Sequence, residues 1–322
     1  MPSRLALGQM IVARFSGPSP SPSLLRRVGR GEVGGVILFA DNVTGGPRRV
    51  RRSVSRLQAV ARRGGHPPLL VAIDQEGGSV RRLPGAPVPA AADMGSASAV
   101  RSQGRRTARL LTRAGATVDL APVADVSSGA RAFLGDRAFG RSPDRVASRA
   151  CAFADGLGDG GVAATLKHFP GLGRATTNTD LARSRVAGGP AALRGDLTAY
   201  RRCGGDDTTL VMMSSASYPG LLGPLPAVLT PDAYRRELPR ATGGRPVTIS
   251  DDLETPAVTA HDRPARRAVN AGLDLLLYAG SERASADAFA RLRADVRAGR
   301  IPKSRIRDAA TRITALKARL AR

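Results

Sequence analysis

Residues 167–180, KHFPGLGRATTNTD, form the stretch that decides the fold. They follow an apolar run at residues 162–166, VAATL, whose length and composition predict a buried strand. Lys167 and His168 therefore stand at the carboxyl end of that strand. Pro170 and Gly171 begin a segment without apolar periodicity, which predicts a long loop. A functional loop after a buried strand is typical of an α/β barrel, where such loops carry the chemistry.

Buried strands and helical segments alternate along the whole chain. Strands are expected at residues 36–39, 69–73, 117–120, 162–166, 209–213, 247–249 and 273–278. Helices are expected at residues 5–15, 24–30, 48–63, 97–114, 142–157, 191–202, 231–238, 284–297 and 303–321. This alternation predicts parallel βαβ units closed into a TIM-type (β/α)8 barrel, with an irregular or missing eighth strand. An open doubly wound sheet is the alternative, although no Gly-x-Gly-x-x-Gly turn follows the first strand.

The length and composition fit one large domain. The chain has 322 residues, a size that α/β barrels reach as a single unit, so we expect one catalytic barrel domain over residues 1–322. Hydrophobic residues make up 42% and aromatic residues only 3%, which predicts a core of Ala, Val and Leu. No metal-ligand cluster and no phosphate-binding loop is apparent, so no metal and no other cofactor is expected.

The formal net charge of +24 raises the question of a polyanionic partner. Of the 50 basic residues, 47 are arginines, and they are scattered through nearly every segment. No basic run with interleaved aromatic residues is present, so we expect no specific nucleic-acid partner. A charge-driven adhesion protein for polyanions or the cell envelope remains an alternative.

Other sequence features concern the compartment. Cys151 and Cys203 show no metal-ligand spacing and are predicted to be two free thiols, with Cys151 inside a helix. No apolar run approaches the roughly 18 residues that a transmembrane helix needs, so no membrane insertion is expected. Gln9 and Arg14 interrupt the apolar N-terminal segment, which lacks a clear cleavage site. We expect a cytoplasmic protein, or an exported one if the true start lies upstream.

Four motifs carry a resemblance to a known family. DQEGG at residues 74–78, GDRAF at 135–139, KHFPG at 167–171 and SDDL at 250–253 occur in the order and at the spacing found in family 3 glycoside hydrolases. The chain most resembles the single-domain β-N-acetylglucosaminidases of that family, from about residue 5 to about residue 320. The pair of KHFPG and DQEGG is specific. The resemblance implies a carbohydrate substrate, held next to the cleaved bond by Asp74, Arg82, Arg137, Lys167 and His168.

Glycoside hydrolysis needs a proton donor and a carboxylate that attacks the sugar or activates water. The resemblance implies that Asp251 is the nucleophile and that its neighbour Asp252 points elsewhere. In these enzymes the loop usually ends in Asp-Ser/Thr-His and the His is the donor, whereas this chain reads Asn178, Thr179, Asp180. An imidazole needs an anionic partner, whereas a carboxylic acid does not. The replacement of the usual Asp by Asn178 therefore fits the replacement of the usual His by Asp180. We expect Asp180 to be the acid, kept protonated by apolar surroundings and the charge of Asp251, with Asn178 able to donate a hydrogen bond.

No other histidine is an evident substitute for the missing proton donor. Glu76 is a spare candidate because it lies in the DQEGG motif near the site. His66 precedes the second strand and is expected at the opposite end of the barrel, and His261 lies in a polar loop beyond Asp251. Lys167 needs acidic or hydroxyl partners if it is buried, and Asp74 is the natural one.

These observations predict a retaining β-N-acetylhexosaminidase, or a related β-glycosidase, that acts through a covalent glycosyl-enzyme. Its expected substrate is the terminal N-acetylglucosamine of bacterial cell-wall fragments. Two alternatives remain: a β-glycosidase of different sugar specificity, and a glycan-binding barrel with weak turnover. The absence of the usual catalytic histidine is the reason to consider the glycan-binding barrel.

Overall fold

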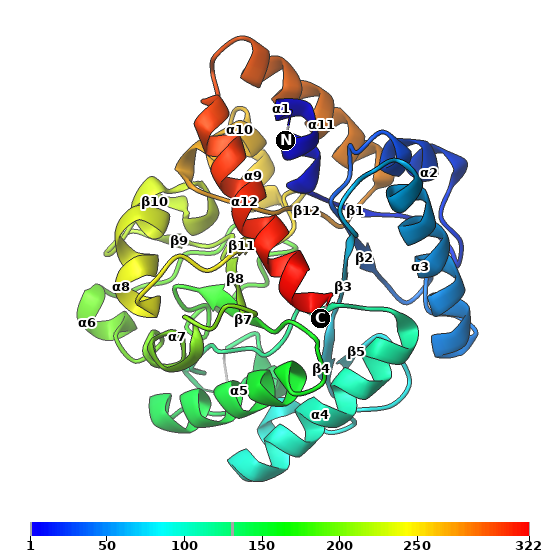
Figure 1. Ribbon diagram of the computed structural model, residues 1–322. Coiled ribbons are helices and arrows are strands. Elements are labelled where there is room, and N and C mark those ends of the chain that lie inside the picture. Colours follow the sequence, from blue (N-terminus) through cyan, green and yellow to red (C-terminus); the bar gives the residue numbers. More distant parts are fainter. Residues whose placement is uncertain (1, 130–131, 322) are drawn as a thin grey trace.

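The computed structural model describes residues 2–129 and 132–321. Within them, eight parallel strands form the inner ring of the molecule and helices surround it (Figure 1). The ring consists of β1 (Ile11–Arg14), β2 (Gly35–Leu38), β3 (Leu70–Ile73), β6 (Val118–Asp119), β7 (Thr165–Phe169), β8 (Leu210–Met213), β11 (Thr248–Ser250) and β12 (Leu276–Tyr278). Two short antiparallel pairs lie outside the ring: β4 (Gln75–Gly77) with β5 (Val80–Arg81), and β9 (Ser217–Tyr218) with β10 (Gly223–Pro226).

The ring closes through two sheets that meet at both seams. One sheet has the order β12-β1-β2-β3-β6 and the other the order β11-β8-β7. A parallel bridge between Val118 and Ala163 joins the sheets at one seam, and a parallel bridge between Ile249 and Leu275 joins them at the other. The predicted (β/α)8 barrel is confirmed, and the open doubly wound sheet is excluded.

The eighth strand is β1, at the start of the chain. We expected one helix over residues 5–15, but helix α1 (Ser3–Gln9) ends before Met10 and the chain continues as β1. β1 pairs with β2 on one side and with β12 on the other, and Ile11, Val12 and Ala13 are buried. Pairing on two sides overrides the helical preference of a short apolar segment, because periodicity alone does not separate a buried strand from a buried helix.

The helices lie outside the ring, and most match the expected segments. After α1 they are α2 (Pro22–Gly29), α3 (Gly46–Arg63), α4 (Ala97–Ala114), α5 (Pro143–Gly158), α6 (Pro190–Leu193), α7 (Thr198–Cys203), α8 (Leu238–Thr242), α9 (Pro256–Thr259), α10 (Pro264–Ala271), α11 (Glu282–Arg297) and α12 (Lys303–Leu320).

Two expected helices differ from the prediction. The helix expected at residues 191–202 is divided into α6 and α7, because the chain turns between them and Asp196 points inward to accept a hydrogen bond from the Val126 N–H. The helix expected at residues 231–238 is a π-helical turn, Ala233–Glu237, followed by α8. In the second case Pro239 falls in the first turn of α8, where its missing N–H costs little.

Strand β7 lies further along the chain than predicted. The expected strand ended at residue 166, whereas β7 runs from Thr165 to Phe169 and includes Lys167 and His168. All five residues are buried, and the Phe169 ring packs edge-on against Tyr200 of α7. Lys167 and His168 are therefore part of the barrel wall, which holds them more rigidly than a loop would.

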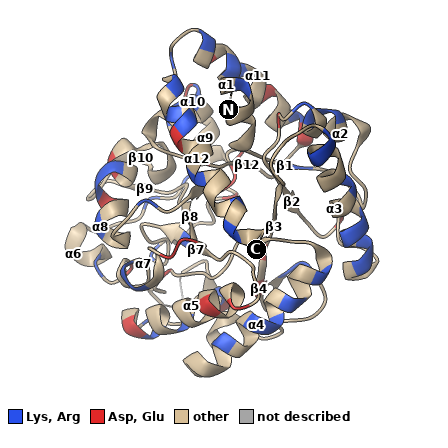
Figure 2. Ribbon diagram, in the orientation of Figure 1, with Lys and Arg blue, Asp and Glu red and all other residues tan. Residues whose placement is uncertain are grey.

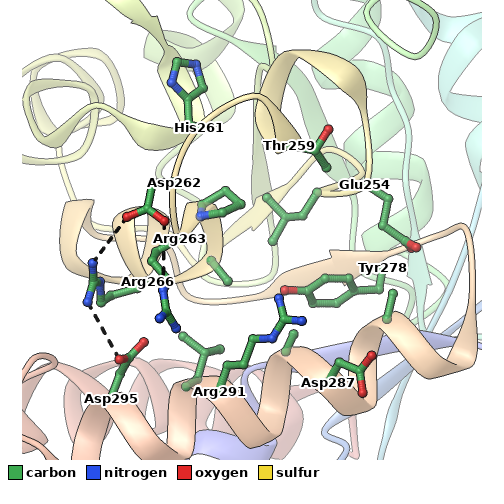
Figure 3. Close-up of a pocket in the computed structure, with 16 residues that line it drawn as sticks. Glu254, Thr259, His261, Asp262, Arg263, Arg266, Tyr278, Asp287, Arg291 and Asp295 are labelled. Atoms are coloured by element: carbon green, nitrogen blue, oxygen red, sulfur yellow. Dashed lines mark ion pairs between the residues drawn. The ribbon is translucent and has the colours of Figure 1, made fainter.

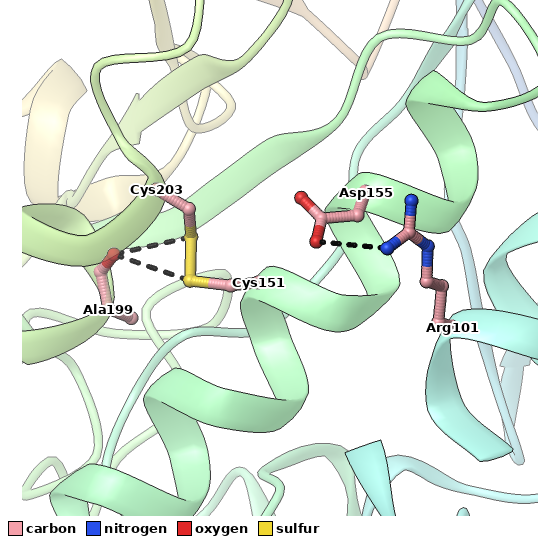
Figure 4. The surroundings of a disulfide bond; sticks show 5 residues. All are labelled: Arg101, Cys151, Asp155, Ala199 and Cys203. Atoms are coloured by element: carbon pink, nitrogen blue, oxygen red, sulfur yellow. Dashed lines mark hydrogen bonds and ion pairs between the residues drawn. A yellow bond between two sulfur atoms is a disulfide. The ribbon is translucent and has the colours of Figure 1, made fainter. Parts of the chain in front are cut away.

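Cys151 and Cys203 form a disulfide, so the prediction of two free thiols is wrong. Their Cα atoms lie 5.6 Å apart, and the bridge joins α5 to α7 (Figure 4). The two cysteines are 52 residues apart in sequence. They meet because α5 and α7 pack against each other, and the spacing of the residues carries no information about that packing.

The basic side chains follow the dispersal seen in the sequence. Figure 2 shows Lys and Arg on helices all around the barrel, including α2, α3, α4 and α10, with no single helix collecting them. Among the helices of the described residues, none is both long and apolar enough to cross a membrane.

Candidate active site

A cavity of about 370 Å³ opens at the carboxyl ends of the barrel strands. We call it the catalytic pocket. Its walls include the ends of β2, β3, β7, β11 and β12 and the loops that follow them. All nine residues singled out from the sequence line it: Asp74, Glu76, Arg82, Arg137, Lys167, His168, Asn178, Asp180 and Asp251.

The floor of the pocket is organised around Lys167, whose side chain is almost completely buried. Its Nζ donates a hydrogen bond to Asp74 at 3.0 Å and lies 2.7 Å from Glu76. Burial alone would lower the pKa of Lys167, but the charges of Glu76 and Asp74 outweigh it and raise the pKa. The expected pairing of Lys167 with Asp74 is confirmed, and the lysine stays charged at every physiological pH.

Glu76 is held in a bidentate ion pair. Arg137 donates to both carboxylate oxygens at 2.8 Å, in the parallel geometry that makes such pairs strong. Burial would raise the pKa of Glu76, but the charges of Lys167 and Arg137 lower it to about 2. Glu76 is therefore ionised and is not the spare proton donor considered from the sequence.

Arg82 sits higher in the pocket, where its guanidinium lies 3.6 Å from Asp74. The Arg82 guanidinium also lies over the ring of Phe39, 5.4 Å from its centroid. This side chain keeps more than a quarter of its surface exposed, so it remains available to a ligand hydroxyl.

His168 is oriented by Asp125, a residue that the sequence analysis did not select. The fully buried Asp125 carboxylate lies 2.8 Å from His168 Nδ1 and accepts the backbone N–H groups of His168 and Leu172. With Nδ1 engaged, Nε2 is the ring nitrogen left to face the pocket. Asp125 follows the third predicted strand, just as Asp74 and Asp251 follow predicted strands. Its position after a strand is the sequence signal by which it could have been selected.

A second overlooked carboxyl, Asp119, lies at the end of β6. It is completely buried, and one oxygen accepts the N–H of Gln75 at 3.0 Å. Burial raises the pKa of Asp119 well above its ordinary value.

Asp251 follows β11 directly and reaches the same pocket. Its backbone N–H donates to the carbonyl of Met213, and its Oδ1 accepts the N–H of Asp252. Asp252 also lines the pocket, and its Oδ1 accepts backbone N–H groups from Glu254 and Ala279. Burial raises the pKa of Asp252 to about 6.

Asp180 lies at the pocket mouth and is solvent-exposed. The surrounding protein still removes part of its hydration and raises its pKa, and the negative charge of Asp251 raises it further. Asn178 supports this position through the backbone, because its side-chain oxygen accepts the Asp180 N–H at 3.0 Å. The sequence suggested Asn178 as a hydrogen-bond donor, whereas in the structure its side-chain oxygen is the acceptor in an Asx turn.

The two remaining histidines lie away from the pocket. His66 Nε2 is 3.0 Å from the Gly29 carbonyl at the opposite end of the barrel, and His261 lines a separate cavity. Among the described residues, Asp180 is thus the exposed carboxyl at the mouth with a raised pKa.

The chain matches known proteins over nearly its whole length. The family model described as the glycosyl hydrolase family 3 N-terminal domain matches residues 4–316. A β-hexosaminidase of Alkalilimnicola ehrlichii is 35% identical over 260 residues, which cover 76% of this chain and 73% of that protein.

Solved structures agree. A family 3 β-N-acetylglucosaminidase from Paenibacillus sp. str. FPU-7 superposes with a TM-score of 0.94 at 30% identity, covering 100% of this chain and 63% of the Paenibacillus chain. A β-N-acetylhexosaminidase from Beutenbergia cavernae has a TM-score of 0.89 at 28% identity, covering 99% of both chains. The chain therefore belongs to glycosyl hydrolase family 3, on the evidence of its barrel, its motifs and its β-hexosaminidase relatives.

Proposed function

We propose that this chain is a retaining β-N-acetylhexosaminidase in which Asp251 is the nucleophile and Asp180 is the acid and base. The observation that carries the proposal is the environment of Asp180. This carboxyl faces the same cavity as Asp251, and the charge of Asp251 helps to raise its pKa. Two carboxyl groups with opposed protonation states are what glycoside hydrolysis requires.

In the first step, an Asp251 oxygen attacks the anomeric carbon as the bond to the leaving oxygen breaks. Asp180 gives its proton to that oxygen and becomes a carboxylate. The product of this step is a glycosyl ester of Asp251. We do not assign this role to Asp252, because burial raises its pKa to about 6 and its Oδ1 accepts two backbone N–H groups.

In the second step, water attacks the anomeric carbon of the ester. Asp180, now ionised, takes a proton from the water and returns to its starting form, while Asp251 leaves as a carboxylate. The floor holds the sugar throughout. Asp74 accepts hydrogen bonds from sugar hydroxyls, Arg82 donates to them, and His168 offers Nε2.

The sugar is N-acetylglucosamine, and the source is a β-linked glycan such as a cell-wall fragment. Relatives named β-hexosaminidase and solved β-N-acetylglucosaminidases support this choice. The cavity volume of about 370 Å³ is at the small end of ligand pockets and suits one or two sugar units.

The test combines turnover with chemical trapping. Wild type should hydrolyse aryl β-N-acetylglucosaminide faster than aryl β-glucoside, and Asp251→Asn should abolish both activities. A 2-deoxy-2-fluoro or 5-fluoro glycosyl fluoride should leave a sugar on Asp251, located by mass spectrometry of peptides. An active enzyme that is labelled at another carboxylate would remove Asp251 from this role, and a folded wild type that hydrolyses neither sugar would refute the function.

A further inference from the structure

A second cavity, of about 690 Å³, lies beside the catalytic pocket. It lies between the loop after β11 and α10 on one side and α11 on the other (Figure 3). We call it the α10–α11 groove. Glu254 lines both cavities, and Leu253 and Tyr278 of the groove directly precede or follow residues that line the catalytic pocket. The two cavities are therefore neighbours at the mouth of the barrel.

The floor of the groove is apolar. It is formed by Leu253, Ala265, Ala288 and Leu292, together with the ring of Tyr278. An apolar floor of this extent suits an aliphatic or aromatic group rather than a bare sugar, whose surface is covered with hydroxyls.

One cation in the groove has no partner. Arg291 extends from α11 toward Tyr278 in Figure 3, and no ion pair or hydrogen bond engages its guanidinium among the residues that the structure describes. The other two arginines of the groove each lie near a carboxylate. Arg266 lies within 4.0 Å of Asp262 and 3.8 Å of Asp295, and Arg263 lies 4.0 Å from Asp262. The four carboxylates that line the groove also have partners: Asp262 and Asp295 lie near Arg266, Asp287 lies 3.6 Å from Arg283, and Glu254 accepts the N–H groups of Gly280 and Ser281. Arg291 is thus the cation available to an anionic ligand.

The groove also adjoins the cavity that contains the acid. Glu254 lines both the groove and the catalytic pocket, and Asp180 lines the same pocket. A proton donor stands beside the leaving oxygen in any glycosidase. A leaving oxygen beside Asp180 therefore lies in the cavity that adjoins the groove.

From this arrangement we propose that the α10–α11 groove binds the leaving group of the substrate, and that this group carries a carboxylate next to an apolar segment. The carboxylate pairs with Arg291 and the apolar segment lies on the floor. The proposal rests on the proposed function, because it assigns the groove to the departing half of the same substrate.

The experiment compares two substrates of equal leaving-group chemistry. Both are phenyl β-N-acetylglucosaminides, one with a para hexanoic acid chain and the other with the matching hexanamide. Wild type should show a kcat/KM about two- to fivefold higher for the acid, the size expected of one partly exposed ion pair. Arg291→Gln should reduce this ratio to about one at unchanged turnover of unsubstituted phenyl glycoside.

Two variants control the result. Arg297→Gln removes an exposed arginine of the same helix that does not line the groove, and it should keep the wild-type ratio. Ala265→Leu fills the floor, and it should lower kcat/KM for both long substrates while sparing the phenyl glycoside. A wild-type ratio of one, or a preference that survives Arg291→Gln, overturns the inference.

Failure of the proposed function is seen separately, as absent turnover of the unsubstituted phenyl glycoside. In that case the groove is tested by calorimetry with free 6-(4-hydroxyphenyl)hexanoate. Binding to wild type that is lost in Arg291→Gln supports the groove, and absence of binding to wild type overturns it.

Discussion

The floor of the catalytic pocket and the loop that carries Asp180 are built in opposite ways. On the floor, Lys167 and Glu76 are buried on strands and joined at 2.7 Å, and Arg137 closes the network with two hydrogen bonds of 2.8 Å. On the loop, Asp180 is exposed, and the hydrogen bond that holds it is local, from its own N–H to Asn178.

The difference shows which residues are free to change. A buried charge without its partner is costly, so each member of the floor depends on the others. The exposed Asp180 at the pocket mouth is held by one turn, so few neighbouring residues depend on it. The loop can therefore present a carboxylic acid in place of an imidazole without disturbing the residues that hold the sugar.

The largest effect is expected from Lys167→Met. The substitution leaves Asp74 without its closest cation and Glu76 with Arg137 alone, in surroundings that disfavour charge. We expect the free energy of unfolding to fall by about 3–5 kcal/mol, with loss of activity. Urea denaturation followed by circular dichroism measures the change.

Arg82→Met is the matched control for the floor. It removes a cation from the same Asp74, but that pair is longer, at 3.6 Å, and more exposed. The unfolding free energy should change by less than about 1 kcal/mol. Equal losses in the two variants would mean that the buried network does not stabilise the floor.

Asp180→Asn should have a large effect on chemistry and almost none on stability. We expect kcat/KM to fall about 100-fold for a poor leaving group such as an alkyl alcohol, and far less for 2,4-dinitrophenol, which needs no proton. The unfolding free energy should stay within about 0.5 kcal/mol of wild type because the side chain is exposed.

The pH dependence gives a second readout of Asp180. The raised pKa means that the acid remains protonated to a higher pH than a free aspartate. Only the protonated form donates, so the wild-type rate on the poor leaving group should fall as pH rises through that pKa. Asp180→Asn should lose this alkaline limb. An equal loss of rate on both leaving groups would contradict the role of Asp180 as acid.

The same contrast explains what the sequence could predict. The alternation of strands and helices was enough for the barrel, and the polar residues after Ile73 and Leu166 were enough for the floor, because strand ends of a barrel converge. β1 was missed because IVAR is too short to show a period. Asp125 could have been selected by its place after the third predicted strand, but its pairing with His168 is visible only in the structure. The disulfide between Cys151 and Cys203 depends on the packing of distant segments, which a single sequence does not encode locally.

The smallest effect is expected from changes to Asn178, which positions Asp180 without touching the substrate. Asn178→Ala removes the acceptor of the Asp180 N–H and should lower kcat/KM on the poor leaving group about fivefold, the equivalent of one hydrogen bond near 1 kcal/mol. Asn178→Asp keeps the acceptor and adds a negative charge beside Asp180. It should therefore retain most of the rate and move the alkaline limb to higher pH, because a neighbouring anion favours the protonated acid. Wild-type activity in Asn178→Ala would show that the turn does not position the acid, and an unshifted limb in Asn178→Asp would show that the limb belongs to another group.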